Sequence, residues 1–283
     1  MKNYKKILLI PIAIFIISII VLSVQYGTTG SFIEKDVSLK GGVSATIYTS
    51  QEINIDQIEQ DFLNQNPGTE ISIRELSTFG TKQSNGIIIE TDASLEQANF
   101  FIEENFPSAD TSIQETGEGL GDSFFKEMIT AIIFAFILMG IVVFITFRKL
   151  IPSLAVIFSA LLDIIATLAI INILGVKLST AGIAAFLMII GYSIDTDIML
   201  TTKVLKRKAG TLWERTVRAF KTGMTMTLTT MAALFVAFLV TNSIILKQMF
   251  GIILIALVID IISTWFMNTG LLIWYMKKNE TDN

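Results

Sequence analysis

The 283-residue chain contains no cysteine and no histidine. The first absence excludes disulfides, thiolate nucleophiles and cysteine-based zinc sites, and the second excludes imidazole ligands and histidine acid–base catalysis. No GxxxxGK(S/T), GxGxxG or HExxH pattern occurs, so nucleotide hydrolysis and metalloprotease chemistry have no recognisable motif. We therefore expect neither an enzyme nor a protein that binds a metal or an organic cofactor. Any chemistry falls to carboxylates, hydroxyls and the backbone.

Charge is also scarce, since only 16% of the residues are charged whereas 52% are hydrophobic. A soluble protein of this length would carry more charge. The apolar residues form six runs, each of about 20 residues or more and thus long enough to cross a bilayer as a helix. These runs are Ile7–Tyr26, Met128–Phe147, Leu150–Leu174, Leu178–Thr202, Thr222–Leu246 and Gln248–Met276. The sequence predicts a polytopic α-helical protein of the lipid bilayer with six transmembrane helices.

The short connections between these runs differ in their content of Lys and Arg. Basic residues gather before the first run, at 148–149, in the loop 203–221 and at 277–278, whereas the alternate connections hold only Lys177 and Lys247. The positive-inside rule places basic connections in the cytoplasm. We expect a multi-pass protein of the cytoplasmic membrane with both termini inside and residues 27–122 outside. The first run lacks a small-x-small cleavage site, so we expect it to remain as a signal anchor.

Residues 27–122 form a polar, acidic insertion between the first two runs. Its pattern predicts the order strand, helix, strand, strand, helix, strand, which is the order of a ferredoxin-like α+β domain. The expected organisation is residues 1–26 as the first helix, 27–122 as the outer domain and 123–283 as a five-helix bundle. The excess of acidic residues argues against binding nucleic acid, which needs a surface rich in Lys and Arg. We expect this domain to bind a partner or a polypeptide.

Two local features add to this organisation. Gly41 and Gly42 precede the first strand, where they allow either a functional hinge or a simple bend into the sheet. In the basic loop 203–221, the stretch "TLWERTVRAF" can form an amphipathic helix along the inner membrane surface.

Four carboxylates interrupt the apolar runs, at Asp163, Asp195, Asp197 and Asp260, and no Lys or Arg lies in these runs to balance them. A carboxylate in hydrocarbon costs several kcal/mol unless it is paired, protonated or facing a polar cavity. The acids could be protonated at rest, could carry protons or another cation, or could meet counter-charges on another chain. They could also simply hydrogen-bond to backbone or hydroxyl groups. We take all four as candidates for proton relay or intramembrane coupling, Asp163 and Asp195 first and Asp197 and Asp260 next.

Polar residues near these acids are candidates for a supporting role. Asp197 shares a helical stripe with Ser193 and Thr201, whereas Asp195 shares a face with Tyr192. In the fifth run, Thr225 and Thr229 form with Thr222 a hydroxyl-lined face able to pair with a polar neighbour.

Several segments together resemble the SecF subunit family of the Sec protein-export machinery, in the resistance–nodulation–division superfamily. "IIGYSIDTDIMLTTKVLKR" is similar to the fourth-helix signature, "LLDIIATLAI" to the third-helix Asp segment and "RAFKTGMTMTLTTMAAL" to the fifth-helix entry. "SLKGGVSATI" resembles the Asp-Phe-x-Gly-Gly element, with Ser38 in place of its Asp. Asp195-Thr196 stands in place of the usual Asn-Asp pair, and in this respect the segment "SIDTDI" resembles the archaeal form of the family.

The resemblance implies a SecD-like partner of similar fold, association with the Sec channel and assistance to polypeptide export driven by the proton-motive force. A half-size, homodimeric exporter of lipids or drugs from the same superfamily is the alternative. That alternative calls for an apolar substrate cleft in a large outer domain. In a third interpretation, the chain only stabilises its partner and the acids hold helices together.

Overall fold

A computed structural model describes residues 8–49, 54–77, 84–206, 210–241 and 243–281. The chain divides into two compact units. One contains residues 35–128 and 178–180, and the other contains residues 1–34, 129–177 and 181–283. Within the described residues, six helices are long and apolar enough to cross a membrane, which confirms the expected fold class of a polytopic helical protein with a small sheet domain.

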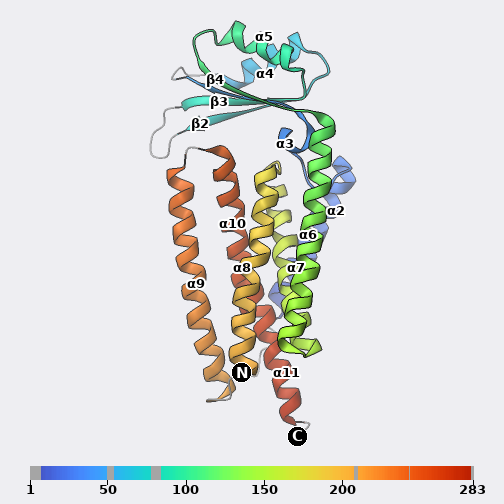
Figure 1. Cartoon of the computed structure of the whole chain (residues 1–283), viewed down its shortest axis with the longest axis vertical. Coiled ribbons are helices and arrows are strands. Elements are labelled where there is room, and N and C mark those ends of the chain that lie inside the picture. The colour runs from blue at the N-terminus through green and yellow to red at the C-terminus, as the bar shows by residue number, and fades with distance from the viewer. Residues whose placement is uncertain (1–7, 50–53, 78–83, 207–209, 242, 282–283) are drawn as a thin grey trace. The chain divides into compact units, whose positions relative to one another are not determined.

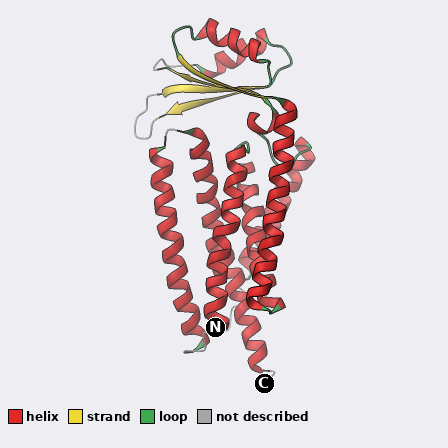
Figure 2. Ribbon diagram, viewed as in Figure 1, coloured by secondary structure: helices red, strands yellow, loops and turns green. Residues whose placement is uncertain are grey.

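The first unit contains a four-stranded antiparallel sheet and two helices that cover one of its faces (Figures 1 and 2). The strands lie side by side in the order β2-β3-β1-β4, and the chain passes through the elements in the predicted order, strand, helix, strand, strand, helix, strand. Their bounds are β1 Gly42–Tyr48, α4 Ile55–Gln65, β2 Ile71–Ser77, β3 Ser84–Thr91, α5 Leu95–Asn105 and β4 Asp110–Thr116.

The core of this unit lies between the sheet and its two helices. Alternate residues of the central strands, Ala45 and Ile47 in β1 and Ile87 and Ile89 in β3, are buried there. In β1 the residues between them are partly exposed, as expected for a sheet with one covered face, whereas in β3 Ile88 is buried as well. The aromatic rings of Phe62 in α4 and Phe101 in α5 meet edge to face with centroids 4.9 Å apart, and join the two helices above the sheet.

The second unit is helical. Its elements are α2 Leu9–Thr29, α6 Glu118–Phe147, α7 Leu150–Ile173, α8 Thr180–Leu205, α9 Leu212–Val240, α10 Ile244–Ile262, the π-helix η1 Ser263–Asn268 and α11 Thr269–Thr281. The first residues of α6 and α8 belong to the α/β unit. The last three elements run on without a break, so that together they form the sixth long apolar helix.

The boundary between the last two spans is a correction to the sequence analysis. The fifth run was expected to continue to Leu246, but α9 ends at Val240 and α10 begins at Ile244. Ser243 starts α10 because its hydroxyl accepts a hydrogen bond from the Leu246 amide at 3.4 Å, as an N-cap does. Lys247 therefore lies in the first turn of a helix and not in a loop.

The basic loop is also shorter than expected. α8 continues to Leu205, and α9 begins at Leu212 with a capping box formed by Thr211 and Glu214. The stretch expected to lie along the membrane surface is instead the first part of the long helix α9. No proline or glycine separates Leu212 from Phe220, so the helix has no reason to stop there.

Candidate functional site

Three of the four predicted carboxyl groups come together inside the helical unit. Asp163 lies in α7, Asp197 in α8 and Asp260 in α10, and each has at most 1% of its surface exposed. The three groups are close enough for their charges to interact. We refer to Asp163, Asp197 and Asp260 as the carboxyl cluster.

Asp163 has a hydrogen-bond donor on each of its carboxyl oxygens. The hydroxyl of Ser193 in α8 donates to Oδ2 at 2.6 Å, and that of Ser263 in η1 donates to Oδ1 at 2.5 Å. O–H···O⁻ bonds of this length are at the strong end of the range seen in proteins. Asp163 thereby connects three helices through one side chain.

Asp197 accepts two hydrogen bonds on a single oxygen. The Thr264 hydroxyl donates to its Oδ1 at 2.9 Å and the Asn268 amide donates to the same atom at 2.7 Å. The Thr264 hydroxyl also lies 3.3 Å from Oδ1 of Asp260, one turn earlier in the same helix. The second oxygens of Asp197 and Asp260 have no partner within the described residues.

The donors from the last span were not among the residues predicted from the sequence. Ser263, Thr264 and Asn268 all lie in η1 and are fully buried. A signal was present in the sequence, since Asp260, Thr264 and Asn268 follow one another at intervals of four, which places them on one face of a helix. π-helical turns occur frequently at functional sites, because the wider turn redirects side chains.

No ion pair involves the cluster within the part of the chain that the structure describes. The donors are hydroxyl and amide groups, and among the same residues no group of three or more acidic side chains has the arrangement of a metal site. Three ionised carboxylates held by neutral donors would repel one another strongly in a low-dielectric interior. The arrangement therefore favours binding of at least one proton or other small cation.

Asp195 has a different environment from the cluster. Its side chain is exposed on α8, whereas Asp197 is fully buried two residues later, as expected for positions about 200° apart on a helix. Ser193 and Thr201 are buried with Asp197 on the predicted stripe, and Ser193 contacts the cluster directly. The Tyr192 hydroxyl donates a hydrogen bond to Oγ1 of Thr230 in α9 at 3.2 Å.

The structure does not bring Thr225 and Thr229 to the carboxyl groups, and a contact of these hydroxyls with a polar neighbour stays a prediction. Both are exposed, and their hydroxyls donate to carbonyl groups of their own helix, Lys221 O and Thr225 O, each at 2.8 Å. A threonine in a helix can satisfy its hydroxyl in this local way, so a hydroxyl stripe does not require a polar neighbour. On this helix, the hydroxyl of Thr222 accepts a hydrogen bond from Lys203 of α8 at 2.6 Å, and that of Thr230 accepts one from Tyr192 of α8.

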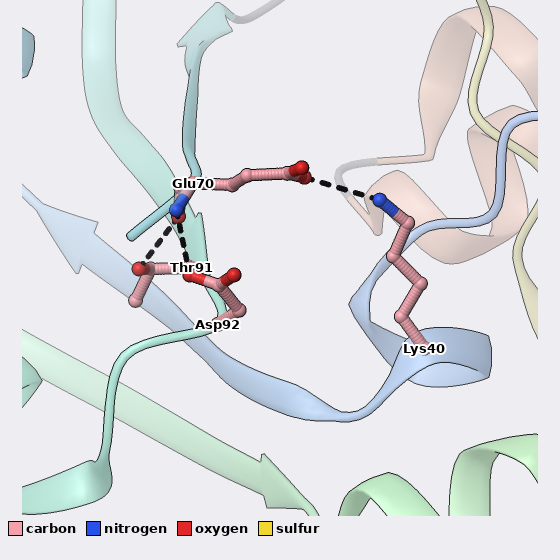
Figure 3. A network of polar contacts seen from close by, with 4 residues as sticks. All are labelled: Lys40, Glu70, Thr91 and Asp92. Atoms are coloured by element: carbon pink, nitrogen blue, oxygen red, sulfur yellow. Dashed lines mark hydrogen bonds and ion pairs between the residues drawn. The ribbon is translucent and has the colours of Figure 1, made fainter. Parts of the chain in front are cut away.

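The two candidate hinge glycines lie where the chain enters the sheet. Both have positive φ, 91° at Gly41 and 127° at Gly42, and a Cβ added at Gly42 would approach Asp92 Cα to 3.2 Å. The surroundings are linked by polar contacts (Figure 3). Lys40 pairs with Glu70 at 3.1 Å, and the backbone of Glu70 bonds the side chains of Thr91 and Asp92. The tight contact explains the glycine at 42, and a hinge motion there stays a prediction.

The fold and the cluster define a class, a polytopic membrane protein with a small α+β domain after its first span and acidic groups buried among its later helices. The family model of the protein export membrane protein SecD/SecF, C-terminal, matches residues 98–278. The chain therefore belongs to the SecD/SecF family.

Curated relatives agree over almost the whole length. The chain is 38% identical to the protein-export membrane protein SecF of Methanolacinia petrolearia over 97% of this chain and 94% of that protein. It is 34% identical to that of Pyrococcus furiosus over 98% of this chain and 92% of the relative. These names describe membrane proteins of export and not enzymes, in agreement with the expectation from composition.

Solved structures share the fold. The translocon-associated membrane protein SecDF from Thermus thermophilus matches with a TM-score of 0.76 at 15% identity, over 98% of this chain. The match spans 38% of the SecDF chain. The likeness at this identity concerns the fold alone.

Proposed function

We propose that this chain is a SecF-type subunit that assists the export of polypeptides across the cytoplasmic membrane, with its carboxyl cluster coupled to the proton-motive force. Membership of the SecD/SecF family carries the export role, because the relatives that match over nearly the full length are protein-export membrane proteins. The cluster supports the coupling, since ionisable groups buried in membrane helices are expensive and usually mark ion pathways.

The distribution of basic side chains supports an orientation with the α/β unit outside. Lys206 in the α8–α9 connection donates to the carbonyl of Thr146 at the end of α6 at 3.0 Å, so these two connections lie at the same end of the helical unit. At the same connections, Arg148, Lys149 and the basic stretch after α8 meet the positive-inside rule for a cytoplasmic face. Residues 27–122 then lie on the opposite side of the membrane.

One exposed face of α8 is consistent with contact to a partner subunit. Ala184, Met188, Gly191 and Asp195 are all exposed and follow at helical spacing, so they form a single stripe. We refer to these four residues as the α8 open face. An ionised Asp195 facing lipid would be costly, whereas a second polypeptide could supply a donor or a positive charge. A SecD-like chain is the partner that family membership suggests.

The α/β unit supports a role at the outer surface. Its single hydrophobic core fills the space between the sheet and the two helices, and its charged residues are mostly acidic. Such a unit suits contact with a polypeptide or another protein better than enclosure of an apolar small molecule. We propose that it contacts the polypeptide as it leaves the Sec channel, and that protonation in the helical unit moves it.

The first test is to tag the chain, extract it gently from native membranes and identify what copurifies. Recovery of a second six-helix chain together with Sec channel subunits is the expected result. Recovery of self-associated chains alone would instead favour a homodimeric exporter of lipids or drugs and would contradict the proposal.

Two matched variants test the partner surface in the same experiment. Asp195→Asn removes a carboxylate from the α8 open face, and Asp197→Asn makes the same change in the buried cluster two residues later. We expect the first to weaken recovery of the second chain and the second to preserve it, at equal abundance of the tagged chain. Equal recovery with both variants would remove Asp195 from the partner contact.

A further inference from the structure

The hydrogen-bond donors around the carboxyl cluster are unequally shared. A hydroxyl carries one hydrogen, and ionised carboxyl groups are acceptors only. Asp163 takes the hydrogens of Ser193 and Ser263, one on each oxygen. Asp197 takes those of Thr264 and Asn268. Both groups thus have two donors, which is the arrangement that stabilises an ionised carboxylate.

Among the described residues, Asp260 has no donor of its own. The hydroxyls of Ser193 and Thr264 both interact with it, but Ser193 donates to Asp163 at 2.6 Å. The Thr264 hydroxyl lies 3.3 Å from Asp260 and closer to Asp197, at 2.9 Å. Since Thr264 has one hydrogen to give, the shorter contact takes it. Oδ2 of Asp260 has no partner within the described residues, although the side chain is 1% exposed. An ionised Asp260 would therefore be buried without compensation, at a high cost.

A second observation points to a missing hydrogen. Oδ2 of Asp197 and Oδ1 of its donor Asn268 are also buried without a partner among the described residues. These two atoms and Oδ2 of Asp260 are all acceptors. The Ser159 hydroxyl is buried and unpartnered as well, but it lies beside Asp197 and not beside Asp260. A hydrogen on Oδ2 of Asp260 would make this atom a donor, which could then pair with a neighbouring acceptor oxygen.

The charged groups around Asp260 strengthen this argument. α7 contributes Asp163 and α8 contributes Asp197, both of the same sign. The helix α2 contains no ionisable residue except Tyr26 near its end, and the charged residues of α9 all lie before Gly223 in its first part. Within the described residues no cation faces the cluster, so a proton is the simplest species that relieves the repulsion.

We infer that Asp260 holds the exchangeable proton of the cluster, whereas Asp163 is a fixed carboxylate anchored by Ser193 and Ser263. This inference rests on the proposed function only for the purpose that the proton serves. In the loaded state Asp260 is a neutral acid whose O–H donates to a neighbouring acceptor oxygen. Transfer of this proton to a water molecule that reaches the cluster breaks the O–H bond and leaves a carboxylate on Asp260. The repulsion among three buried anions then favours a rearrangement of the helices that carry them.

Infrared difference spectroscopy on the full chain with its copurifying subunits in lipid vesicles tests the assignment. A buried neutral carboxyl group has its own C=O band, which shifts when the solvent is changed to D₂O. We expect the band in the wild type, its loss in Asp260→Asn and its retention in Asp163→Asn and in Asp195→Asn. Asp260→Glu, which keeps an acid at this place, should move the band and not remove it.

Three results would overturn the inference. A band that survives in Asp260→Asn, or one that is lost only in Asp163→Asn, would place the proton elsewhere. Loss of the wild-type band when NaCl replaces choline chloride at constant pH would assign the site to a sodium ion. The band depends on the cluster and not on export, so failure of the proposed function would leave this result readable. If the band is assigned to Asp260 but export does not change when the pH gradient is removed, the result would count against the proposed function instead.

Discussion

Replacing Gly223 by alanine tests the packing that holds η1 against α8 and α9. Gly223 is buried in α9, and a Cβ built there would lie 2.9 Å from one ring atom of Trp265 and 3.0 Å from the Met199 methyl group. A second ring atom of Trp265 would come closer still. Trp265 also meets Phe220 edge to face, with centroids 5.0 Å apart, so the ring has little freedom to move away.

The magnitude follows from two opposing effects. Alanine stabilises a helix by about 1 kcal/mol relative to glycine, and overpacking of a filled core costs about 1–3 kcal/mol. Gly191→Ala is the matched control because it lies in α8 with nothing within 4 Å of an added Cβ, and it gains only the helix term. Gly223→Ala should therefore be less stable than Gly191→Ala by about 1–3 kcal/mol, which corresponds to a melting midpoint lower by roughly 2–10 °C.

The assay is thermal unfolding of the purified full chain without its partner, followed by the intrinsic fluorescence of tryptophan. The absence of the partner matters because Gly191 belongs to the α8 open face. A midpoint of Gly223→Ala equal to or above that of Gly191→Ala would refute the reasoning, since it would mean that Trp265 yields at no cost. We also expect Gly223→Ala to lower export, because displacement of Trp265 moves the neighbouring donor Thr264.

Three further changes have separate readouts. Asp163→Asn should lower export at unchanged abundance, because the cluster loses its fixed negative charge, and wild-type export would argue against that role. Ser94→Ala removes the α5 capping box and should cost about 1 kcal/mol, seen as roughly fivefold faster amide hydrogen exchange in α5 of the full chain. Gly86 has φ of 147°, and a Cβ added there would come within 3.0 Å of backbone atoms of β1. Gly68 has φ of 93°, but a Cβ added there would meet nothing within 4 Å. Proteolysis of the α/β unit should accelerate more for Gly86→Ala than for Gly68→Ala, and equal rates would contradict the close approach.

The order of elements could be predicted because it depends on patterns that are local in the sequence. Apolar runs of sufficient length predicted the six spans. The β-branched residues of "NGIIIET" and its neighbours, bounded by turn residues, predicted the strands. The break between α9 and α10 was misplaced because the residues on both sides are apolar, and the Ser243 cap is a weak signal beside Lys247.

The carboxyl cluster could be predicted only in part. The stripe of Ser193, Asp197 and Thr201 follows from helical spacing, but spacing alone does not say which side of an apolar helix faces the other helices. The sequence interpretation placed Asp195 before Asp197, and only the packing shows that Asp195 is the exposed one and Asp197 the buried one. Whether the donors in η1 reach the carboxyl groups depends on how η1 packs against the other helices, and the sequence of a single span does not show this packing.

The π-helix also fixes the rotation of the last span about its own axis. An α-helix turns about 100° for each residue, and a π-helical turn accommodates an extra residue, so α11 is out of phase with α10 by about that angle. The α10 and α11 halves of the span consequently present different sides to their neighbours. The residues before Ser263 and those after Asn268 obey two separate helical wheels, and one wheel drawn through the whole span would assign half of it to the wrong side.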